Sequence, residues 1–257
     1  MLKRISLPFH SANERRYGYR TASLFHGLLM ELISPDYAAY LHENALHPFS
    51  LHLGQAENGG VLTVSALTAE AAEQIMPPLR TLKTAYLAQK DDELLFDAPD
   101  EQSVTYHELF RKHYIREDAA RLVQLNFNTP AAFKSAGQYV NMPTAKLIVS
   151  GLAKRYDMTC GVHDTVYETL FEEIEQRVTI SAFRIRNASF PVEGVYIPAF
   201  MGTLTLKISG SPTFRSYINM LCDYAQYSGV GIKTGLGMGA VTAEPVIVKG
   251  GMNQHGS

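Results

Sequence analysis

Hydrophobic positions recur along this chain with two spacings, and the elements that they predict come twice in the same order. Alternating apolar positions indicate strands, whereas leucines spaced four apart within residues 22–33 indicate a helix. The first half is predicted to contain a strand over 2–8, this helix, a short helical or looped segment over 37–44, strands over 49–53 and 61–66, a helix from Thr68 through Ile75 and a strand near 81–87.

Proline and glycine mark the boundaries of these elements. Ser34-Pro35-Asp36 stops the first helix, because the residue before a proline disfavours helical torsion angles. Pro77-Pro78 is predicted to end the second helix, and Asn58-Gly59-Gly60 is typical of a hairpin turn. The stretch 88–101 is acidic and contains Pro99, so it is predicted to be a linker or loop.

The second half repeats the same order. It is predicted to contain a strand over 121–127, helices over 144–156 and 165–175, strands over 178–185 and 195–208 with Phe190-Pro191 between them, a helix over 213–227 and a strand over 240–248. The order βαββαβ is that of the ferredoxin-like unit. The sequence therefore predicts an α+β fold of two tandem ferredoxin-like, RRM-like domains, over 1–117 and 118–249, followed by a disordered tail over 250–257.

The composition is that of a folded cytoplasmic protein. Of 257 residues, 46% are hydrophobic and 19% are charged, which is enough to bury a core. The two cysteines, Cys160 and Cys222, are too few for a disulfide scaffold. The first residues are not typical of a signal peptide, and no stretch of the sequence approaches the roughly 18 apolar residues of a membrane span. We therefore predict a cytoplasmic location and no membrane partner.

The net charge of −2 conceals an uneven distribution. Residues 1–30 carry +4, residues 31–101 carry −9 and residues 111–257 carry +4, with Glu108 between the last two blocks. The total argues against a polybasic protein that coats any duplex, because such proteins have a large basic excess. The two basic regions nevertheless allow a local groove for nucleic acid.

The most distinctive segment lies at 229–239 and has five glycines and one lysine in eleven residues. Glycines permit a backbone that approaches a ligand closely, and backbone N–H groups can bind phosphate oxygens. The segment is neither a P-loop nor a dinucleotide fingerprint, since Ile232 and Thr234 stand where those motifs need glycine, and it is predicted to follow a helix and precede a strand. A tight helix-to-strand connection would need only one or two of these glycines.

The glycine-rich segment and its neighbours resemble a known family. The segment from Tyr227 to Val241 is similar to the C-terminal glycine-rich loop of the CRISPR-associated repeat-RNA endoribonucleases of the RAMP superfamily. Their pattern Gly-x-Gly-x5-Gly-x-Gly is met by Gly229, Gly231, Gly237 and Gly239. The resemblance extends to Leu24-Phe-His-Gly-Leu-Leu29, Tyr40-Leu-His-Glu43 with Pro48-Phe49-Ser50 after it, and Thr129-Pro-Ala-Ala-Phe-Lys134.

The resemblance implies cleavage of CRISPR repeat RNA without a metal or organic cofactor. The ribose 2′-OH would attack the adjacent phosphate, which requires a base, an acid and a positive charge for the phosphorane. His42 matches the family segment that carries a catalytic histidine and is predicted as the general base. His26 is predicted as the general acid or phosphate donor, although the two roles could be exchanged or His26 could be a buried helix residue. His47 falls where some relatives have a catalytic lysine, and Lys233 or Arg20 could supply the remaining charge.

RNA binding is predicted for the glycine-rich segment and for basic residues of the second half. Arg184 and Arg186 alternate along a predicted strand and so share one face. Lys154 and Arg155 are further phosphate-contact candidates, or else form a solvated helix end. The predicted RNA-binding residues are Gly229, Gly231, Lys233, Gly235, Gly237, Gly239, Lys134, Lys146, Arg184 and Arg186. Phe127, Phe183 and Phe200 are predicted to be core residues rather than an RNA-stacking platform.

Two alternatives stay open at this point. A non-catalytic RNA-binding member would keep the fold and glycine-rich loop but would not cleave, and a small-molecule enzyme with the same fold would not bind RNA. The expected partner is CRISPR repeat RNA, and other CRISPR-associated subunits or a second copy of the chain could also bind. No cofactor is predicted.

Overall fold

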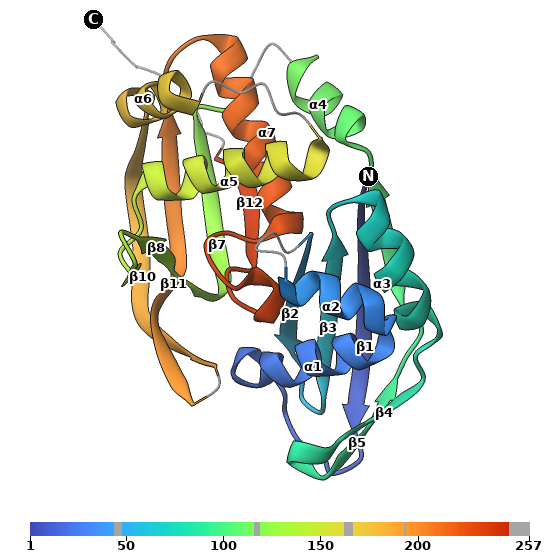
Figure 1. Ribbon diagram of the computed structural model, residues 1–257. Helices are drawn as coiled ribbons and strands as arrows, with labels where there is room; N and C mark the ends of the chain where they lie inside the picture. The colour runs from blue at the N-terminus through green and yellow to red at the C-terminus, as the bar shows by residue number, and fades with distance from the viewer. Residues whose placement is uncertain (44–47, 116–118, 162–166, 193, 247–257) are drawn as a thin grey trace, which may run out of the picture.

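The computed structural model describes residues 1–43, 48–115, 119–161, 167–192 and 194–246. Two antiparallel sheets lie side by side, each with helices packed on one of its faces (Figure 1). Each sheet has the strand order of a ferredoxin-like unit, so the predicted α+β fold class is confirmed. None of the helices within these ranges is long and apolar enough to cross a membrane.

The N-terminal sheet has β1 at its centre, with β3 on one side and β5 and β6 on the other. Its strands are β1 Leu2–Ser11, β2 Phe49–Gln55, β3 Gly60–Ala66, β4 Thr84–Leu87, β5 Asp92–Phe96 and β6 Asp100–Val104. Leu7 and Phe9 of β1 point into the core with Leu62 and Val64 of β3, whereas the alternate positions form a more polar face that includes Arg4.

The predicted linker over 88–101 is wrong, because this stretch contains β5 and the start of β6, the two strands that pair with β1 on the side away from β3. Strand β5 pairs with Phe9–Ser11, and β6 pairs with Leu2–Ser6. The predicted last strand, β4, pairs instead with β5 at the edge. The acidic composition obscured an alternating pattern in which Asp92, Leu94 and Phe96 are buried. Asp92 can be buried because it accepts hydrogen bonds from the hydroxyls of Ser11 and Tyr17, both at 2.6 Å.

Three helices cover one face of this sheet, and one of them is longer than predicted. They are α1 Ala22–Leu32, α2 Pro35–Glu43 and α3 Ala69–Thr81. The prediction that Pro77-Pro78 ends α3 is wrong, since both prolines lie inside it. Proline interrupts helical hydrogen bonding, but Ile75, Met76 and Leu79 are all buried against the sheet, and their packing holds the last turn in place.

The connection between the two sheets contains α4 Tyr106–Tyr114, which the sequence analysis missed. Thr105 caps it: its hydroxyl accepts from the Glu108 N–H at 3.0 Å, and the Glu108 carboxylate accepts from the Thr105 N–H at 2.8 Å. This reciprocal pair is a capping box. The Thr-x-x-Glu pattern before an apolar position was the available sequence signal.

The C-terminal sheet has the order β10-β11-β7-β12, as the predicted strand–helix–strand–strand–helix–strand order requires. Its elements are β7 Leu122–Ala131, α5 Ala145–Cys160, α6 Tyr167–Arg177, β10 Val178–Val192, β11 Val195–Ile208, α7 Pro212–Ser228 and β12 Val241–Pro245. A small hairpin of β8 Phe133–Ser135 and β9 Gln138–Val140 lies beside this sheet. Phe190-Pro191, expected between two strands, lies within β10, and the predicted tail lies outside the described residues.

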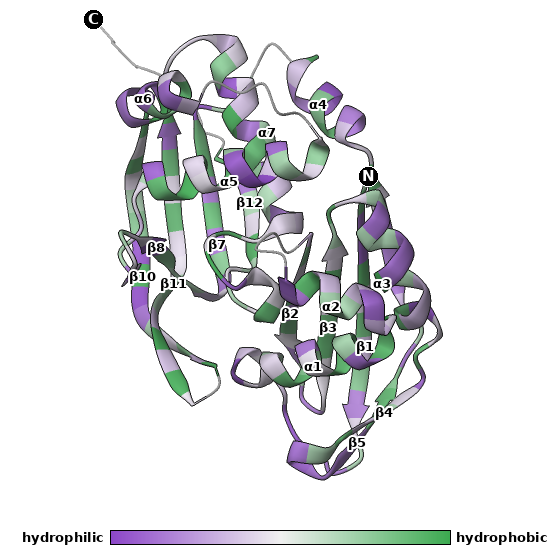
Figure 2. Ribbon diagram, in the orientation of Figure 1, coloured by the Kyte–Doolittle hydropathy of each residue, from purple (hydrophilic) through white to green (hydrophobic). Residues whose placement is uncertain are grey.

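Hydrophobic positions concentrate on the strands of both sheets, whereas the outer surfaces of α3 and α6 are largely hydrophilic (Figure 2). Phe127 and Phe200 are core residues as predicted, but Phe183 is 64% exposed, so that part of the prediction is wrong. The two cores interlock. Phe190 and Met238 of the C-terminal half pack with the N-terminal core, and Leu2 packs with the C-terminal core.

Candidate RNA-cleavage site

The glycine-rich segment connects α7 to β12, as predicted, and lies against the N-terminal half (Figure 1). Its middle forms a short 3-10 helix, η3 Thr234–Leu236, which contacts α1 and β2. The segment therefore joins the second half of the protein to the helix that carries His26.

Close packing within the protein explains several of the glycines. Gly231 has a φ of +88° and a Cβ there would collide with the Ala132 carbonyl, while at Gly237, with a φ of +111°, it would collide with the Ala22 side chain. Some amides are also already bonded: the Ile232 N–H donates to Ala132 O at 3.0 Å. The glycines thus allow the segment to dock, and their predicted contact with RNA stays a prediction.

His26 contacts the glycine-rich segment directly. Its Nδ1 lies 3.0 Å from the Gly235 carbonyl oxygen, and its ring stacks on Phe49 with centroids 6.0 Å apart and an interplanar angle of 11°. The side chain is half-buried. A carbonyl oxygen can only accept, so Nδ1 carries the proton in this contact. Proton exchange with a substrate would then take place through Nε2, in whichever direction the proton moves.

Arg155 of α5 stabilises the packing of the glycine-rich segment against β2. The sequence predicts a phosphate contact or a solvated helix end, but the side chain is enclosed by protein and its burial lowers the pKa of the guanidinium. It donates to the hydroxyl of Thr234 and, at 3.0 Å, to the Phe49 carbonyl. One buried cation therefore holds the glycine-rich segment and the first residue of β2 in register with α5.

His42, His47 and His52 do not share the surroundings of His26. His42 lies in the last turn of α2 and is exposed, and its catalytic role stays a prediction. His47 lies outside the described residues. His52 lies on β2 among protein atoms, and burial, followed by the nearby charge of Arg4, lowers the pKa of His52 to about 4.

A second contact between the halves lies at the end of α7. Arg4 donates to the Gln226 carbonyl, and its guanidinium lies 4.4 Å from the centre of the Tyr227 ring. The Ser50 hydroxyl donates to the Tyr227 carbonyl at 2.5 Å. Sequence reasoning missed these joints because a lone arginine or serine on a strand carries no signal of its partner.

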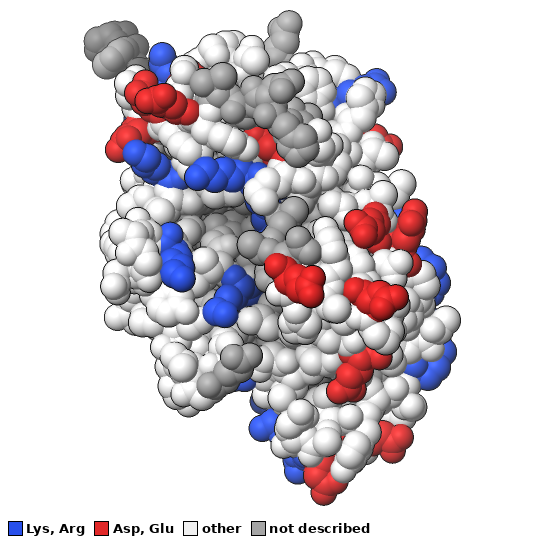
Figure 3. Space-filling view, in the orientation of Figure 1, with Lys and Arg blue, Asp and Glu red and all other residues white. Residues whose placement is uncertain are grey.

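Basic side chains gather over α5 and near the glycine-rich segment, whereas acidic ones lie over α2 and α3 and around α6 (Figure 3). A pocket of about 270 Å³ next to the segment is lined by Lys134, Lys154, Ser150, Gly229 and Gly231. The Ser150 hydroxyl is buried and has no hydrogen-bond partner among the described residues.

The remaining predicted basic residues are accessible to a ligand. Lys146 is bound to Glu175 at 2.7 Å, but both side chains are about half exposed. Arg184 and Arg186 are exposed on β10, and Lys233 is half-buried with a φ of +52° at the start of η3. Their contacts with RNA stay predictions.

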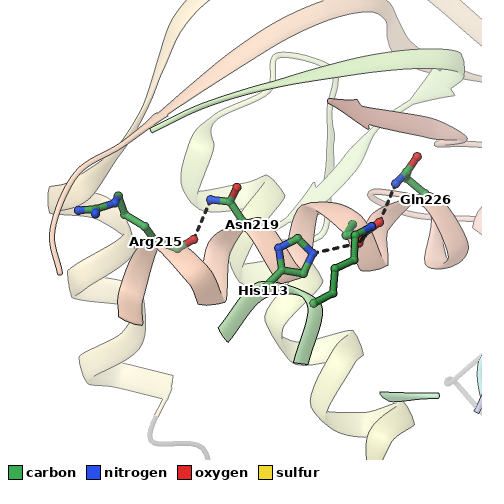
Figure 4. Close-up of polar contacts among 6 residues, drawn as sticks. His113, Arg215, Asn219 and Gln226 are labelled. Carbon is green, nitrogen blue, oxygen red and sulfur yellow. Dashed lines mark hydrogen bonds and ion pairs between the residues drawn. The ribbon is translucent and has the colours of Figure 1, made fainter. Parts of the chain in front are cut away.

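Another pocket, of about 470 Å³, lies elsewhere, between α4, α7 and β12. Here Asp223 accepts hydrogen bonds from His113 Nε2 at 2.9 Å, Lys112 Nζ at 2.7 Å and Gln226 Nε2 at 2.9 Å (Figure 4). Burial would raise the pKa of Asp223, but the bonds from His113 and Lys112 outweigh it and lower the pKa. The bonds from Lys112 and His113 to Asp223 hold α4 against α7. Within the described ranges, no three His, Cys, Asp or Glu side chains are grouped so as to hold a metal ion.

Comparison with known proteins gives the family. The family model of the CRISPR-associated endoribonuclease Cas6 matches residues 125–241. A CRISPR-associated endoribonuclease Cas6 of Streptococcus thermophilus is 30% identical over 220 residues, which cover 86% of this chain and 90% of that protein. One of Mycobacterium tuberculosis is 32% identical over 224 residues, covering 86% and 71%.

Solved structures agree in fold. A Cas6 product complex superposes with a TM-score of 0.79 at 22% identity, covering 95% of this chain and all of that one. Thermus thermophilus Cas6 gives 0.71 at 23% identity, with 95% and 98% covered. Sequence relatives that align over most of both chains, together with this shared fold of tandem ferredoxin-like domains, lead to one conclusion: the chain belongs to the Cas6 family of CRISPR-associated endoribonucleases.

Proposed function

We propose that this protein cleaves precursor CRISPR RNA within its repeats by attack of a ribose 2′-OH on the adjacent phosphate. The products would be guide RNAs that carry a 5′-OH and a 2′,3′-cyclic phosphate. The observation that carries the proposal is the contact between His26 Nδ1 and the Gly235 carbonyl, because it fixes an imidazole at the junction of the two halves. Family membership supplies the endoribonuclease class.

The chemistry needs one group to take a proton from the 2′-OH and one to give a proton to the leaving 5′ oxygen. An imidazole with an ordinary pKa near 6.5 can do either near neutral pH. We assign one transfer to His26 through Nε2 and the other to His42, with His47 as a further candidate. Lys233 lies in the same segment as Gly235 and would stabilise the charge on the phosphorane.

The RNA would run from this junction over the C-terminal half. Lys134 and Lys154 line the pocket beside the glycine-rich segment, and phosphate oxygens entering it would meet these two cations and the Ser150 hydroxyl. Lys146, Arg184 and Arg186 would extend the same basic surface. Other subunits of a CRISPR complex, or a second copy of the chain, would bind outside this path.

The decisive experiment is cleavage of a labelled repeat RNA in EDTA, followed by analysis of the product ends. We expect cleavage at one position, a cyclic phosphate on the upstream fragment and a 5′-OH on the downstream one. A 2′-deoxy nucleotide at the mapped position should abolish cleavage, since the nucleophile is then missing. The matched control is a 2′-deoxy substitution one nucleotide away, which should have little effect.

Each other outcome identifies a different function. Tight binding of the repeat without cleavage would show a non-catalytic RNA-binding member. Cleavage of the 2′-deoxy substrate, or products with a 5′-phosphate, would show that water and not the ribose is the nucleophile. Both results would overturn the proposed mechanism while leaving the family assignment unchanged.

A further inference from the structure

A third pocket opens beside β10, the edge strand of the C-terminal sheet, and next to residues 141–142, which follow the β8–β9 hairpin. It has a volume of about 270 Å³. Its lining includes Asn141, Met142, Phe183, Ile185, Asn187 and Phe200. Neither the fold nor the proposed cleavage chemistry requires a pocket at this place.

Phe183 is the residue that the fold does not explain. It pairs across the strands with Leu204, so both point to the same face of the sheet. Leu204 is buried, yet Phe183 is 64% exposed, and Met142, which lines the same pocket, is 58% exposed. An irregularity between Ile180 and Ala182 shifts the register of β10 just before Phe183. A cluster of exposed large apolar side chains of this kind marks an interaction surface.

Charge indicates what the partner is. The five strands β7 to β11 contain Lys134, Arg184, Arg186 and Lys207 and no aspartate or glutamate. Arg184 and Arg186 are exposed on β10 on either side of Ile185. A second copy of the chain paired antiparallel along this edge would bring arginines next to arginines, which is unfavourable. A polyanion, by contrast, is complementary in charge to this basic edge of the sheet.

The lining also suits a flat, polar-edged group. An exposed phenyl ring offers a stacking face for a base, and the polarizable thioether of Met142 packs well against aromatic rings. The side-chain amides of Asn141 and Asn187 each offer both a donor and an acceptor, as the edge of a nucleobase requires. Apolar stacking surfaces beside two amides and the Arg186 side chain, which also lines the pocket, are a combination that suits single-stranded RNA.

We propose that this pocket holds one unstacked base of the bound RNA, with Phe183 as its stacking face, and that it acts as a specificity site separate from the cleavage site. The inference rests on the proposed function in that repeat RNA is the ligand. The base pocket and the pocket next to the glycine-rich segment are connected by one pair of stacked phenylalanine rings. Phe133, which lines the pocket next to the glycine-rich segment, stacks on Phe200, which lines the base pocket, with centroids 6.2 Å apart.

The test is a scan of the repeat RNA with single abasic nucleotides, using the RNA that is blocked by 2′-deoxy substitution at its mapped cleavage position. For the wild-type protein, we expect one abasic position to raise Kd by about 5- to 150-fold, the range for loss of one stacked base. Phe183→Ala should raise Kd for the unmodified RNA by a similar factor and should remove the penalty at that one position. Phe183→Tyr should restore both values.

The matched control is Phe110→Ala, which removes a phenylalanine that is 44% exposed on α4. It should leave every Kd in the scan unchanged. Equal abasic penalties in the wild type and in Phe183→Ala would overturn the base pocket and leave the proposed cleavage intact. A lost penalty in Phe183→Ala, in a protein that binds but does not cleave the unblocked RNA, would support the pocket and overturn the cleavage. Absence of any repeat-RNA binding by the wild type would overturn both.

Discussion

Two histidines lie at helix contacts in this protein, and their partners differ. His26 of α1 contacts a backbone carbonyl of the glycine-rich segment, whereas His113 of α4 contacts the Asp223 carboxylate, which also binds Lys112 and Gln226. A backbone carbonyl is a neutral acceptor, and it orients the imidazole of His26 through Nδ1. The Asp223 carboxylate accepts hydrogen bonds from three side chains, and this contact holds α4 against α7. We therefore expect the partner, rather than the histidine itself, to distinguish the proposed site of proton transfer from a structural contact.

The largest expected effect comes from removing the oriented imidazole. His26→Ala should lower the single-turnover rate of repeat cleavage by on the order of 100- to 10,000-fold, as loss of a proton-transfer group does, with RNA affinity nearly unchanged. His113→Ala is the matched control and should leave the rate within a few-fold while lowering the midpoint of thermal unfolding. If the two variants lost cleavage equally, the distinction between their sites would be incorrect.

His42→Ala tests whether the second proton transfer belongs to the exposed histidine at the end of α2. We expect a loss of rate in the same range, on the order of 100-fold or more, and unchanged affinity for the repeat. An unchanged rate would remove His42 from the mechanism and leave His26 with a different partner.

His52 sharpens the comparison, because its burial gives it a pKa of about 4 against about 6.5 in an unfolded chain. Both states are neutral at pH 7. As the pH falls below about 6.5, the unfolded chain binds the proton first, so the unfolding free energy should decrease by up to about 3 kcal/mol on reaching pH 4. Urea unfolding of His52→Gln should show a flatter dependence. The same slope in both proteins would contradict this assignment.

Asp223→Asn should have a smaller effect, confined to stability. We expect a loss of about 1–3 kcal/mol in the free energy of unfolding, since charge-assisted hydrogen bonds from His113 and Lys112 are weakened. Because the native pKa of Asp223 is lowered, its contribution is present above about pH 4 and is lost as the pH falls further. Lys146→Ala is the control, since its ion pair with Glu175 is exposed and should contribute at most about 1 kcal/mol.

Periodicity and glycine spacing predicted the order of most elements, and they failed where tertiary contacts decide. The prolines in α3 are tolerated because Leu79 is buried beyond them, and β5 contains a buried aspartate whose partners lie some eighty residues earlier in the chain. Phe183 was predicted to be buried because an aromatic residue in a strand usually is. Its exposure on β10, next to a shift in the register of pairing with β11, is a tertiary feature that no local pattern indicates.

The candidate site likewise combines residues that the sequence indicates with contacts that it does not. The sequence indicated His26 and the glycine-rich segment separately, through their resemblance to a family. Their contact at 3.0 Å depends on residues 209 positions apart. Arg155 could not be predicted as a contact between the halves, since Thr234 and the Phe49 carbonyl, which both accept hydrogen bonds from it, lie in different halves. Long-range partners of this kind carry no local pattern.

The exchange of core residues between the halves has a consequence for how the protein melts. Phe190 and Met238 complete the N-terminal core and Leu2 the C-terminal one, so separating the halves would expose apolar surface on both. We expect a single calorimetric transition, and fragments divided at the predicted boundary of 117 and 118 should be insoluble alone yet reassemble when expressed together. Two well-separated transitions would contradict this. A single transition would mean that the protein unfolds as one cooperative unit, so that damage to either core would also disrupt the contact that holds His26.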